Sequence, residues 1–209
     1  MVTLTGIDAE NLAEIYKESF SLLGYRFFET GDYNINIVGV RNDSGLADRF
    51  DDKLNVFYKE EGEWVVDSYP ITTEPGPNIL RWPLKSVRHK GTAILVPNQY
   101  RGVYQIGTHG GKRRYTALVQ RGGPVEVYRD NNRDRTPDTD VPIERGMFGI
   151  NIHRQFGPDD REDPGGSSAG CQVFQSSVDF YHFMDTCQTA AEIWGNSFTY
   201  TLVTEEEIS

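Results

Sequence analysis

The sequence lacks several features that define large classes of protein. Its two cysteines, Cys171 and Cys187, are too few for a disulfide framework, and neither lies in a paired metal-type spacing. No apolar run approaches the roughly 20 residues of a membrane span. Basic residues are not in excess, because the net charge is −10. That charge argues against nucleic acid as the main partner and against a polybasic membrane anchor.

The first nine residues also lack the basic start and apolar centre of a signal peptide. We therefore expect this chain to reach any substrate outside the cell by another route. Carriage on a phage particle and release at lysis are two such routes, and a signal removed from this chain is a third.

The composition is that of a globular protein rich in strands and turns. The 209 residues are 37% hydrophobic and 12% aromatic, with 21 glycines and 10 prolines. This length suits one domain with a core large enough to do without disulfides. We predict a mainly β (α+β) fold, with an N-terminal helical segment over residues 1–32 packed on a single domain over residues 33–209.

Two segments have helical periodicity. Residues 8–23 predict an amphipathic helix with Asp8 as N-cap, Gly24 as stop signal, and Leu12, Ile15 and Leu22 on one face. A second helix is predicted between a capping pair, Ser176 and Asp179, and Gly195. Its apolar stripe comprises Phe180, Phe183, Met184, Cys187, Ala191 and Trp194. Cys187 is thus predicted to be a core residue, whereas His182 lies off the stripe.

The remainder is predicted to be strands. A charged turn at residues 60–62 predicts a hairpin between two of them. The expected strands are 34–40, 54–58, 63–69, 93–96, 102–106, 116–120, 125–128, 146–152 and 198–204.

Two distant side chains, Cys171 and His153, carry the chemistry that we expect. Cys171 follows small residues at 167–170, which leave a sulfur accessible and allow backbone N–H groups to converge on an acyl oxygen. His153 follows the expected strand 146–152, which would hold an imidazole rigidly as the base for a thiol nucleophile. The alternatives are a small buried cysteine and a hydrogen-bonded histidine at a strand end.

The spacing of these residues resembles the catalytic motif of the L,D-transpeptidase (YkuD-type) family. In that motif a histidine is followed, about 14 to 17 residues later, by Ser or Thr, His, Gly and Cys. Here 14 residues separate His153 from Ser168, and Gly170 and Cys171 complete the pattern. The resemblance extends over residues 33–204, with 97–104 similar to the family's approach to the site. Segments 146–153 and 169–174 also resemble a phage-associated branch.

This resemblance implies a cysteine acyl-transfer enzyme acting on peptidoglycan stem peptides, either an L,D-transpeptidase or an L,D-carboxypeptidase. His153 would take the proton of Cys171, the sulfur would form a thioester, and N–H groups near Gly170 and Cys171 would hold the oxyanion. It further implies a β-sandwich or barrel, no cofactor for catalysis, and a partner that is cell wall, without nucleic acid or membrane insertion.

Two positions depart from the family motif. Ala169 stands where the family has its second histidine, and Gln172 stands where Arg or Asn is usual. Both departures bear on substrate choice and on the balance between transfer and hydrolysis. They also leave open a virion or wall-binding structural protein that retains the fold, and a cysteine peptidase with another substrate. The candidate substrate-binding residues are Ser168, Arg154, Gln172, Ala169 and His109.

His109 lies in a glycine-rich stretch, 107–112, which is either the rim of a site or an exposed loop. A zinc site built from His89, His109 and His153 lacks any paired histidine spacing.

An acidic loop carries oxygen side chains at every second position from 130 to 138. The pattern resembles the start of an EF-hand-type calcium loop, although Arg135 replaces the expected Gly and Val141 the bidentate Glu. We expect either a structural Ca²⁺ or an ordinary polar loop of turn formers. The candidate ligands are Asp130, Asn132, Asp134, Thr136 and Asp138.

Overall fold

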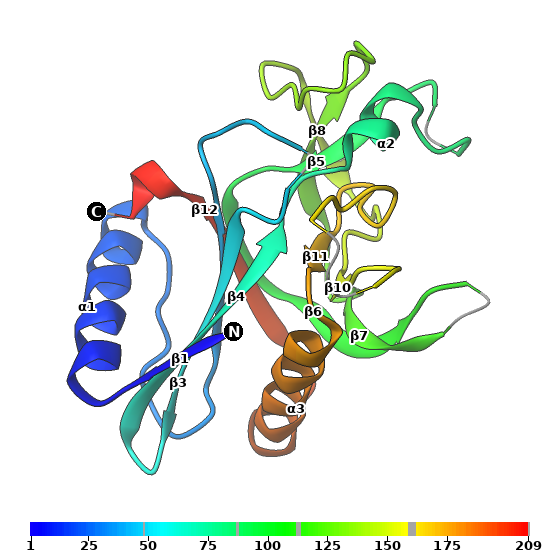
Figure 1. The fold of residues 1–209 in the computed structure, drawn as a ribbon. Coiled ribbons are helices and arrows are strands. Elements are labelled where there is room, and N and C mark those ends of the chain that lie inside the picture. The colour runs from blue at the N-terminus through cyan, green and yellow to red at the C-terminus, as the bar shows by residue number, and fades with distance from the viewer. Residues whose placement is uncertain (48, 87, 112–113, 159–161, 209) are drawn as a thin grey trace.

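The computed structural model of the chain describes residues 1–47, 49–86, 88–111, 114–158 and 162–208. Lys112 of the glycine-rich stretch and residues 159–161 of the spacer between His153 and Ser168 lie outside the described residues. The fold is mainly β, as predicted (Figure 1). Among the described residues, no helix combines the length and apolar character needed to span a bilayer.

The larger sheet closes on itself. Its strand order is β1-β4-β11-β10-β7-β6-β12-β2-β3, and β3 pairs back onto β4. Since β4 pairs with β3 on one edge and with β11 on the other, the strands form a barrel-like ring. The strands are β1 (Val2–Thr5), β2 (Asn36–Arg41), β3 (Asp52–Glu60), β4 (Glu63–Thr72), β6 (Asn98–His109), β7 (Tyr115–Gln120), β10 (Ile152–Arg154), β11 (Gln172–Phe174) and β12 (Phe198–Thr204).

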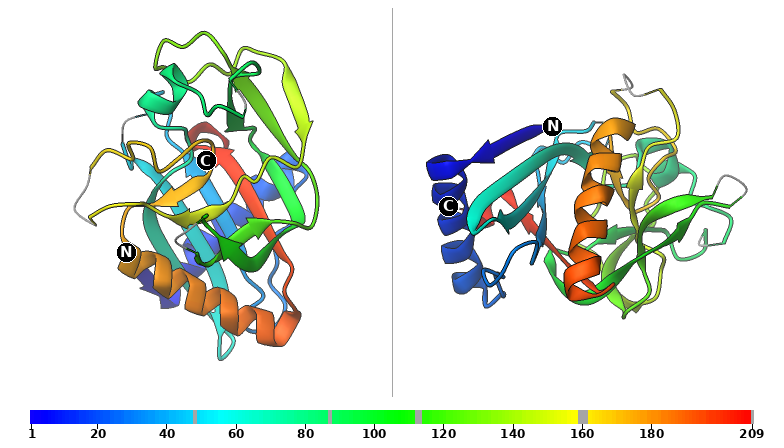
Figure 2. Two further views of the ribbon diagram at one scale, coloured as in Figure 1. Left: turned by 90° about the vertical axis from the view of Figure 1, so that its right-hand side faces the viewer. Right: turned by 90° about the horizontal axis from the view of Figure 1, so that it is seen from below.

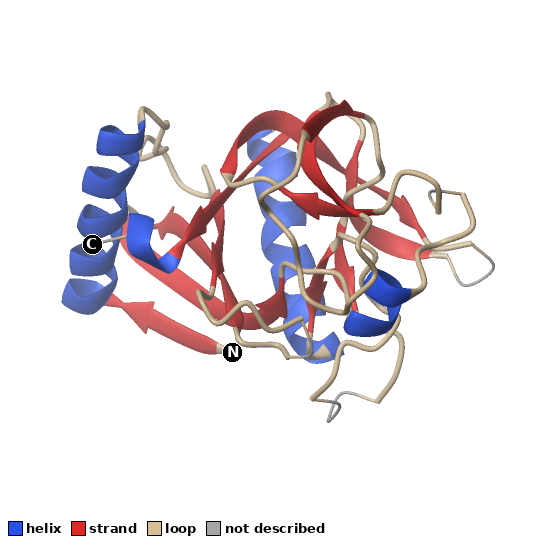
Figure 3. Ribbon diagram, turned by 90° about the horizontal axis from the view of Figure 1, so that it is seen from above, coloured by secondary structure: helices blue, strands red, loops and turns tan. Residues whose placement is uncertain are grey.

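A smaller sheet lies beside this ring. It has the order β5-β8-β9, from β5 (Thr92–Leu95), β8 (Val125–Asp130) and β9 (Ile143–Gly146). The short helix α2 (Pro77–Arg81) lies at the same side of the molecule, away from α1 (Gly6–Leu23), as Figure 3 shows. A 3-10 turn, η1 (Glu205–Glu207), follows β12.

The predicted hairpin is confirmed between β3 and β4. Glu60 pairs with Glu63, which leaves Glu61 and Gly62 as a two-residue turn with φ of 52° and 85°. Positive φ at both positions is the geometry that matches the twist of the flanking strands.

The second predicted helix, α3 (Ser177–Trp194), is also confirmed. The Ser176 side chain accepts from the Asp179 N–H at 3.2 Å, as a helix cap should. Cys187 is fully buried, and its neighbours on the stripe, Phe180 and Phe183, enter the same core cluster. Figure 2 (right) shows β3 and β4 in cyan between α1 in blue and α3 in orange.

The N-terminal helix α1 exists, but only part of the expected apolar face is right. Leu12 packs against the core cluster that includes Ala9, Ala13 and Phe20, whereas Ile15 and Leu22 are exposed. The expected N-cap was wrong, because Thr5 and not Asp8 holds that position. The helix begins after Thr5, and Gly24 ends it in the left-handed conformation, as predicted.

The expected strand 146–152 is instead a loop between β9 and β10. The N–H groups of Phe148, Gly149 and Ile150 converge on Gln120 Oε1 at 3.1, 2.8 and 3.1 Å. Three donors on one side-chain oxygen cannot coexist with a strand ladder, so the chain turns here. As a result, His153 lies in the middle of the short strand β10.

Candidate active site

Parallel pairing of two short strands brings Cys171 and His153 together. Within the β10–β11 pair, Ile152 lies opposite Gln172 and His153 opposite Val173. Cys171 immediately precedes β11 and Asn151 immediately precedes β10, so the Asn151 N–H reaches Cys171 Sγ at 3.4 Å. The thiol and the imidazole consequently line one cavity of about 470 Å³.

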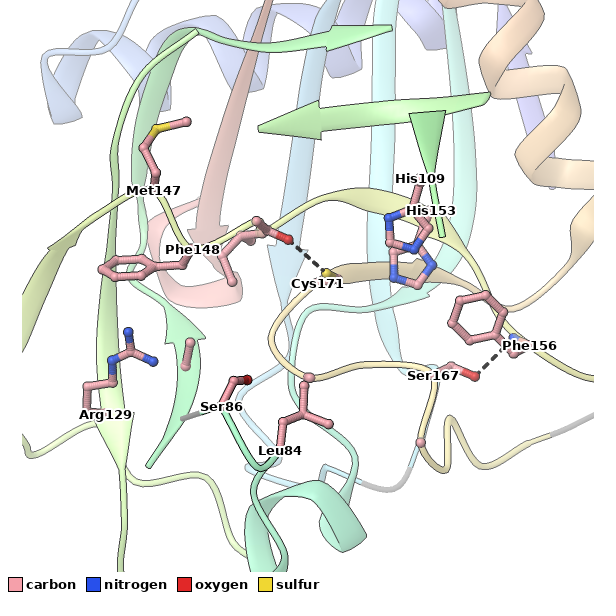
Figure 4. Close-up of a pocket in the computed structure, with 15 residues that line it drawn as sticks. Leu84, Ser86, His109, Arg129, Met147, Phe148, His153, Phe156, Ser167 and Cys171 are labelled. Atoms are coloured by element: carbon pink, nitrogen blue, oxygen red, sulfur yellow. Dashed lines mark hydrogen bonds between the residues drawn. The ribbon is translucent and has the colours of Figure 1, made fainter. Parts of the chain in front are cut away.

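The cavity wall is largely apolar, with Leu84, Phe148 and Phe156 among its residues. The stacked imidazoles lie on one side of the Cys171 sulfur and the Phe148–Gly149 segment on the other (Figure 4). Four predicted site residues line this cavity: Cys171, His153, His109 and Ala169.

His153 is held as a neutral base. Its Nδ1 lies 2.7 Å from the Arg154 carbonyl oxygen, which can only accept, so Nδ1 carries the proton and Nε2 the free lone pair. Tyr115 Oη lies 3.3 Å from the same nitrogen. Burial, and then the neighbouring His109, lower the pKa of His153 to about 3.

Cys171 is held as a neutral thiol. Its sulfur lies 3.5 Å from the Gly149 carbonyl oxygen, to which it donates. Its enclosed surroundings raise the pKa of the thiol to about 11, against the opposing effect of the Asn151 N–H. The resting pair is therefore uncharged, and the sulfur must lose its proton as it attacks rather than beforehand.

Ser168 and Gly170 shape the turn before Cys171 and do not line the cavity. Ser168 Oγ donates to the Cys171 carbonyl at 2.9 Å and accepts from the Gly170 N–H at 3.3 Å. Gly170 has φ of +114°, and a Cβ there would lie 2.4 Å from the Ala93 carbonyl oxygen. Its N–H, expected at the oxyanion, is thus engaged by Ser168 instead.

Gln172 and Arg154 likewise point away from the cavity. Gln172 is fully buried, and its Oε1 accepts from Tyr200 Oη at 2.8 Å. The Arg154 guanidinium lies over the Tyr115 ring at 4.7 Å. Arg154 acts on the site through its carbonyl group, which the sequence did not indicate.

Three polar residues complete the site: His109, a candidate from the sequence, and Asn151 and Arg129, which sequence reasoning missed. The His109 ring stacks on His153 with centroids 4.1 Å apart and an angle of 19°. Its Nδ1 lies 3.0 Å from Asn151 Nδ2. On another wall, Arg129 lies over the Phe148 ring at 4.5 Å, with its Nε 2.6 Å from Glu144.

The acidic loop binds its own backbone. Oxygens of Asp130, Asn132 and Asp134 accept from the N–H groups of Asp138, Asp134 and Thr136 at 2.9, 3.1 and 2.8 Å. Within the described ranges, no group of three or more His, Cys, Asp or Glu side chains is placed to hold a metal ion. Asp130 Oδ1 is buried without a hydrogen-bond partner among the described residues.

Comparison with known proteins adds no relative to this description. No family model matches the sequence, no curated protein matches it, and no solved structure matches the fold. The function of this chain is therefore inferred from the geometry of the cavity and from the spacing of its residues.

Proposed function

We propose that the chain is a cysteine acyl-transfer enzyme acting on peptidoglycan stem peptides, as an L,D-transpeptidase or an L,D-carboxypeptidase with a related fold. The observation that carries the proposal is the shared cavity of Cys171 and His153. The Arg154 carbonyl fixes Nδ1 of His153 as the protonated nitrogen, which leaves Nε2 as the basic one. The motif-like spacing of the two residues agrees with it.

The reaction follows from these groups. His153 Nε2 accepts the proton of Cys171 as Sγ bonds to the substrate carbonyl carbon. The C–N bond then breaks, the departing amine takes the proton from His153, and a thioester remains. An incoming amine gives a crosslink, whereas water gives a trimmed peptide, with His153 accepting and returning a proton in either case.

Arg129 supports a substrate that carries a carboxylate. Its Nε is engaged by Glu144, and its stacking on Phe148 holds the guanidinium plane in place. Lys90 also contacts Glu144 at 2.6 Å, so the three groups together carry net positive charge. Stem peptides end in carboxylates, and a preorganised guanidinium binds that group well.

A second candidate is a virion or wall-binding structural protein that retains the fold without activity. The raised pKa of Cys171 favours it because it makes the thiolate harder to form, and the engaged Gly170 N–H favours it because that group is not free to hold an oxyanion. A cysteine peptidase with another substrate would share the first chemical step and differ only in the peptide accepted.

The deciding experiment is mass spectrometry of purified disaccharide tetrapeptides incubated with the protein and, in parallel, with Cys171→Ala. We expect loss of the terminal D-Ala or formation of a dimer with the native protein alone. Unchanged muropeptides in both samples, with both proteins folded, would favour the structural candidate. Products from both samples would show that Cys171 is not the nucleophile.

A further inference from the structure

Several backbone donors near the thiol are already occupied. The Gly170 N–H donates to Ser168 Oγ, and the N–H groups of residues 148–150 donate to Gln120 Oε1. A tetrahedral intermediate nevertheless needs donors on its oxygen, since these supply much of the rate in acyl transfer. With these donors engaged, a side-chain donor in the cavity would act together with the Cys171 N–H on that oxygen.

The hydrogen bonds of Asn151 fix the tautomer of His109. The Gln120 N–H donates to Asn151 Oδ1 at 2.9 Å, so the other amide atom, Nδ2, faces His109. An amide NH₂ group only donates, and it lies 3.0 Å from His109 Nδ1. His109 Nδ1 must therefore be unprotonated, and the ring carries its proton on Nε2.

The two stacked rings consequently hold opposite tautomers. His153 is protonated on Nδ1 and accepts through Nε2, whereas His109 is protonated on Nε2 and donates through it. Both rings line the cavity that contains the thiol, and Asn151 links His109 to it through its side-chain amide and its N–H to Cys171 Sγ. One ring is arranged as a base and the other as a donor.

We propose that His109 is a second catalytic residue, whose Nε2–H donates to the substrate carbonyl oxygen as Cys171 attacks. The inference rests on the proposed acyl-transfer function and adds a role beyond it. His109 keeps its proton throughout and stabilises the oxyanion by hydrogen bonding. Burial lowers the pKa of His109, which keeps the ring neutral, and a neutral imidazole is an effective donor to a carbonyl.

The test compares two reactions of Cys171 in the full-length protein. Alkylation by iodoacetamide passes through no oxyanion, whereas acylation by p-nitrophenyl acetate does. His109→Phe keeps an aromatic stack without a donor, and His109→Gln restores an N–H near the Nε2 position. His153→Phe is the reference for loss of the base. The control is His89→Phe, at an exposed position outside the cavity.

We expect His109→Phe to slow acylation about 100-fold and alkylation by less than about threefold, with His109→Gln recovering part of the acylation rate. His153→Phe should slow both reactions, and His89→Phe neither. Peptide mapping assigns the label to Cys171, since Cys187 is fully buried.

Three results would overturn the role of His109: an equal fall in both reactions, no fall in acylation, or ring ¹⁵N NMR shifts that place the His109 proton on Nδ1. The NMR measurement requires no activity. If the protein leaves muropeptides intact but its variants show the expected rates with p-nitrophenyl acetate and iodoacetamide, the proposed substrate is wrong and His109 is supported as the donor.

Discussion

His153 and Cys171 owe their uncharged resting state to the same enclosed surroundings. The pKa of His153 lies at about 3 and that of Cys171 at about 11, so the thiol–imidazole form that reacts persists between these values. We expect kcat/KM on a muropeptide to be level from about pH 4 to about pH 10. An acid limb near pH 6.5 would instead indicate an imidazole with its ordinary pKa and contradict the neutral pair.

Arg129 allows a test of whether the site binds a negatively charged substrate. Arg129→Met keeps an aliphatic stem over Phe148 but removes the cation. We expect kcat/KM for tetrapeptide muropeptides to fall about 10- to 100-fold, because a hydrogen bond to a charged group contributes about 1.5–3 kcal/mol. Acylation by the uncharged p-nitrophenyl acetate should be unaffected. Equal losses with both substrates would mean that Arg129 only supports the cavity wall.

The sequence singled out the candidate pair but not the residues that surround it. Cys171 and His153 stand out because their spacing is specific to a known motif. Asn151, Gln120 and Arg129 form contacts that depend on strand register and on the 147–151 loop, and no local pattern encodes either. Gln172 was misjudged for the same reason, since the direction of its side chain depends on the pairing of β11.

At the scale of elements, Glu74 just beyond β4 makes the fold sensitive to pH. Burial raises the pKa of Glu74 to about 7, although Arg41 Nε, 3.9 Å away, opposes the shift. A carboxyl group whose pKa is raised by folding stabilises the folded state while it is protonated. This contribution is complete below the unfolded pKa of 4.5 and is lost as pH rises through 7. We expect Glu74→Gln to gain about 1–3 kcal/mol in unfolding free energy relative to native at pH 8, and little at pH 4.

Urea denaturation across this pH range measures the difference. Subtracting the unfolding free energy of the native protein from that of the variant at each pH removes the contribution of His153, because both proteins contain it. Its lowered pKa has the opposite effect, destabilising the fold as pH falls through 6.5. A difference that stays constant with pH would show that folding does not raise the pKa of Glu74.

The acidic loop, residues 130–138, can be tested for calcium binding through its effect on thermal stability. One oxygen each of Asp130, Asn132 and Asp134 accepts from the backbone of the same loop, whereas Asp130 Oδ1 is buried without a partner in the described part of the chain. Among the described residues the carboxylates are not gathered into a group that could hold a metal ion. We therefore expect the protein to have the same Tm in millimolar CaCl₂ as in MgCl₂ or EDTA. A calcium-specific rise in Tm that Asp134→Asn abolishes would establish the ion site instead.

At the scale of the whole molecule, periodicity predicted α3 and the β3–β4 hairpin because both are local. A barrel was one of the two arrangements that the resemblance implied, but closure of the sheet through one particular strand was not predicted. It depends on the short strand β11, which is parallel to β10 and antiparallel to β4. β1 was missed too, and it pairs with a strand some 60 residues away. Since β10 and β11 carry the candidate site, the sequence indicated the candidate residues without the architecture that joins them.

The ring of strands separates two cores, and only one of them supports the site. In β2, Ile37 enters the inner core with α3, whereas its neighbour Val38 enters the outer core with α1. Phe180 of the inner core lies edge-on to Tyr115 at 6.0 Å, and Tyr115 contacts His153. Phe20 of α1 belongs to the outer core and packs on Phe27.

Phe20→Ala and Phe180→Ala are thus a matched pair, both fully buried phenylalanines on helices. Each should lower the unfolding free energy by about 3–5 kcal/mol in urea. Only Phe180→Ala should also slow acylation of Cys171 under folding conditions, because it frees Tyr115 and the His153 ring to move. Equal slowing in Phe20→Ala would show that the outer helix is coupled to the site through the sheet, and that the two cores act as one.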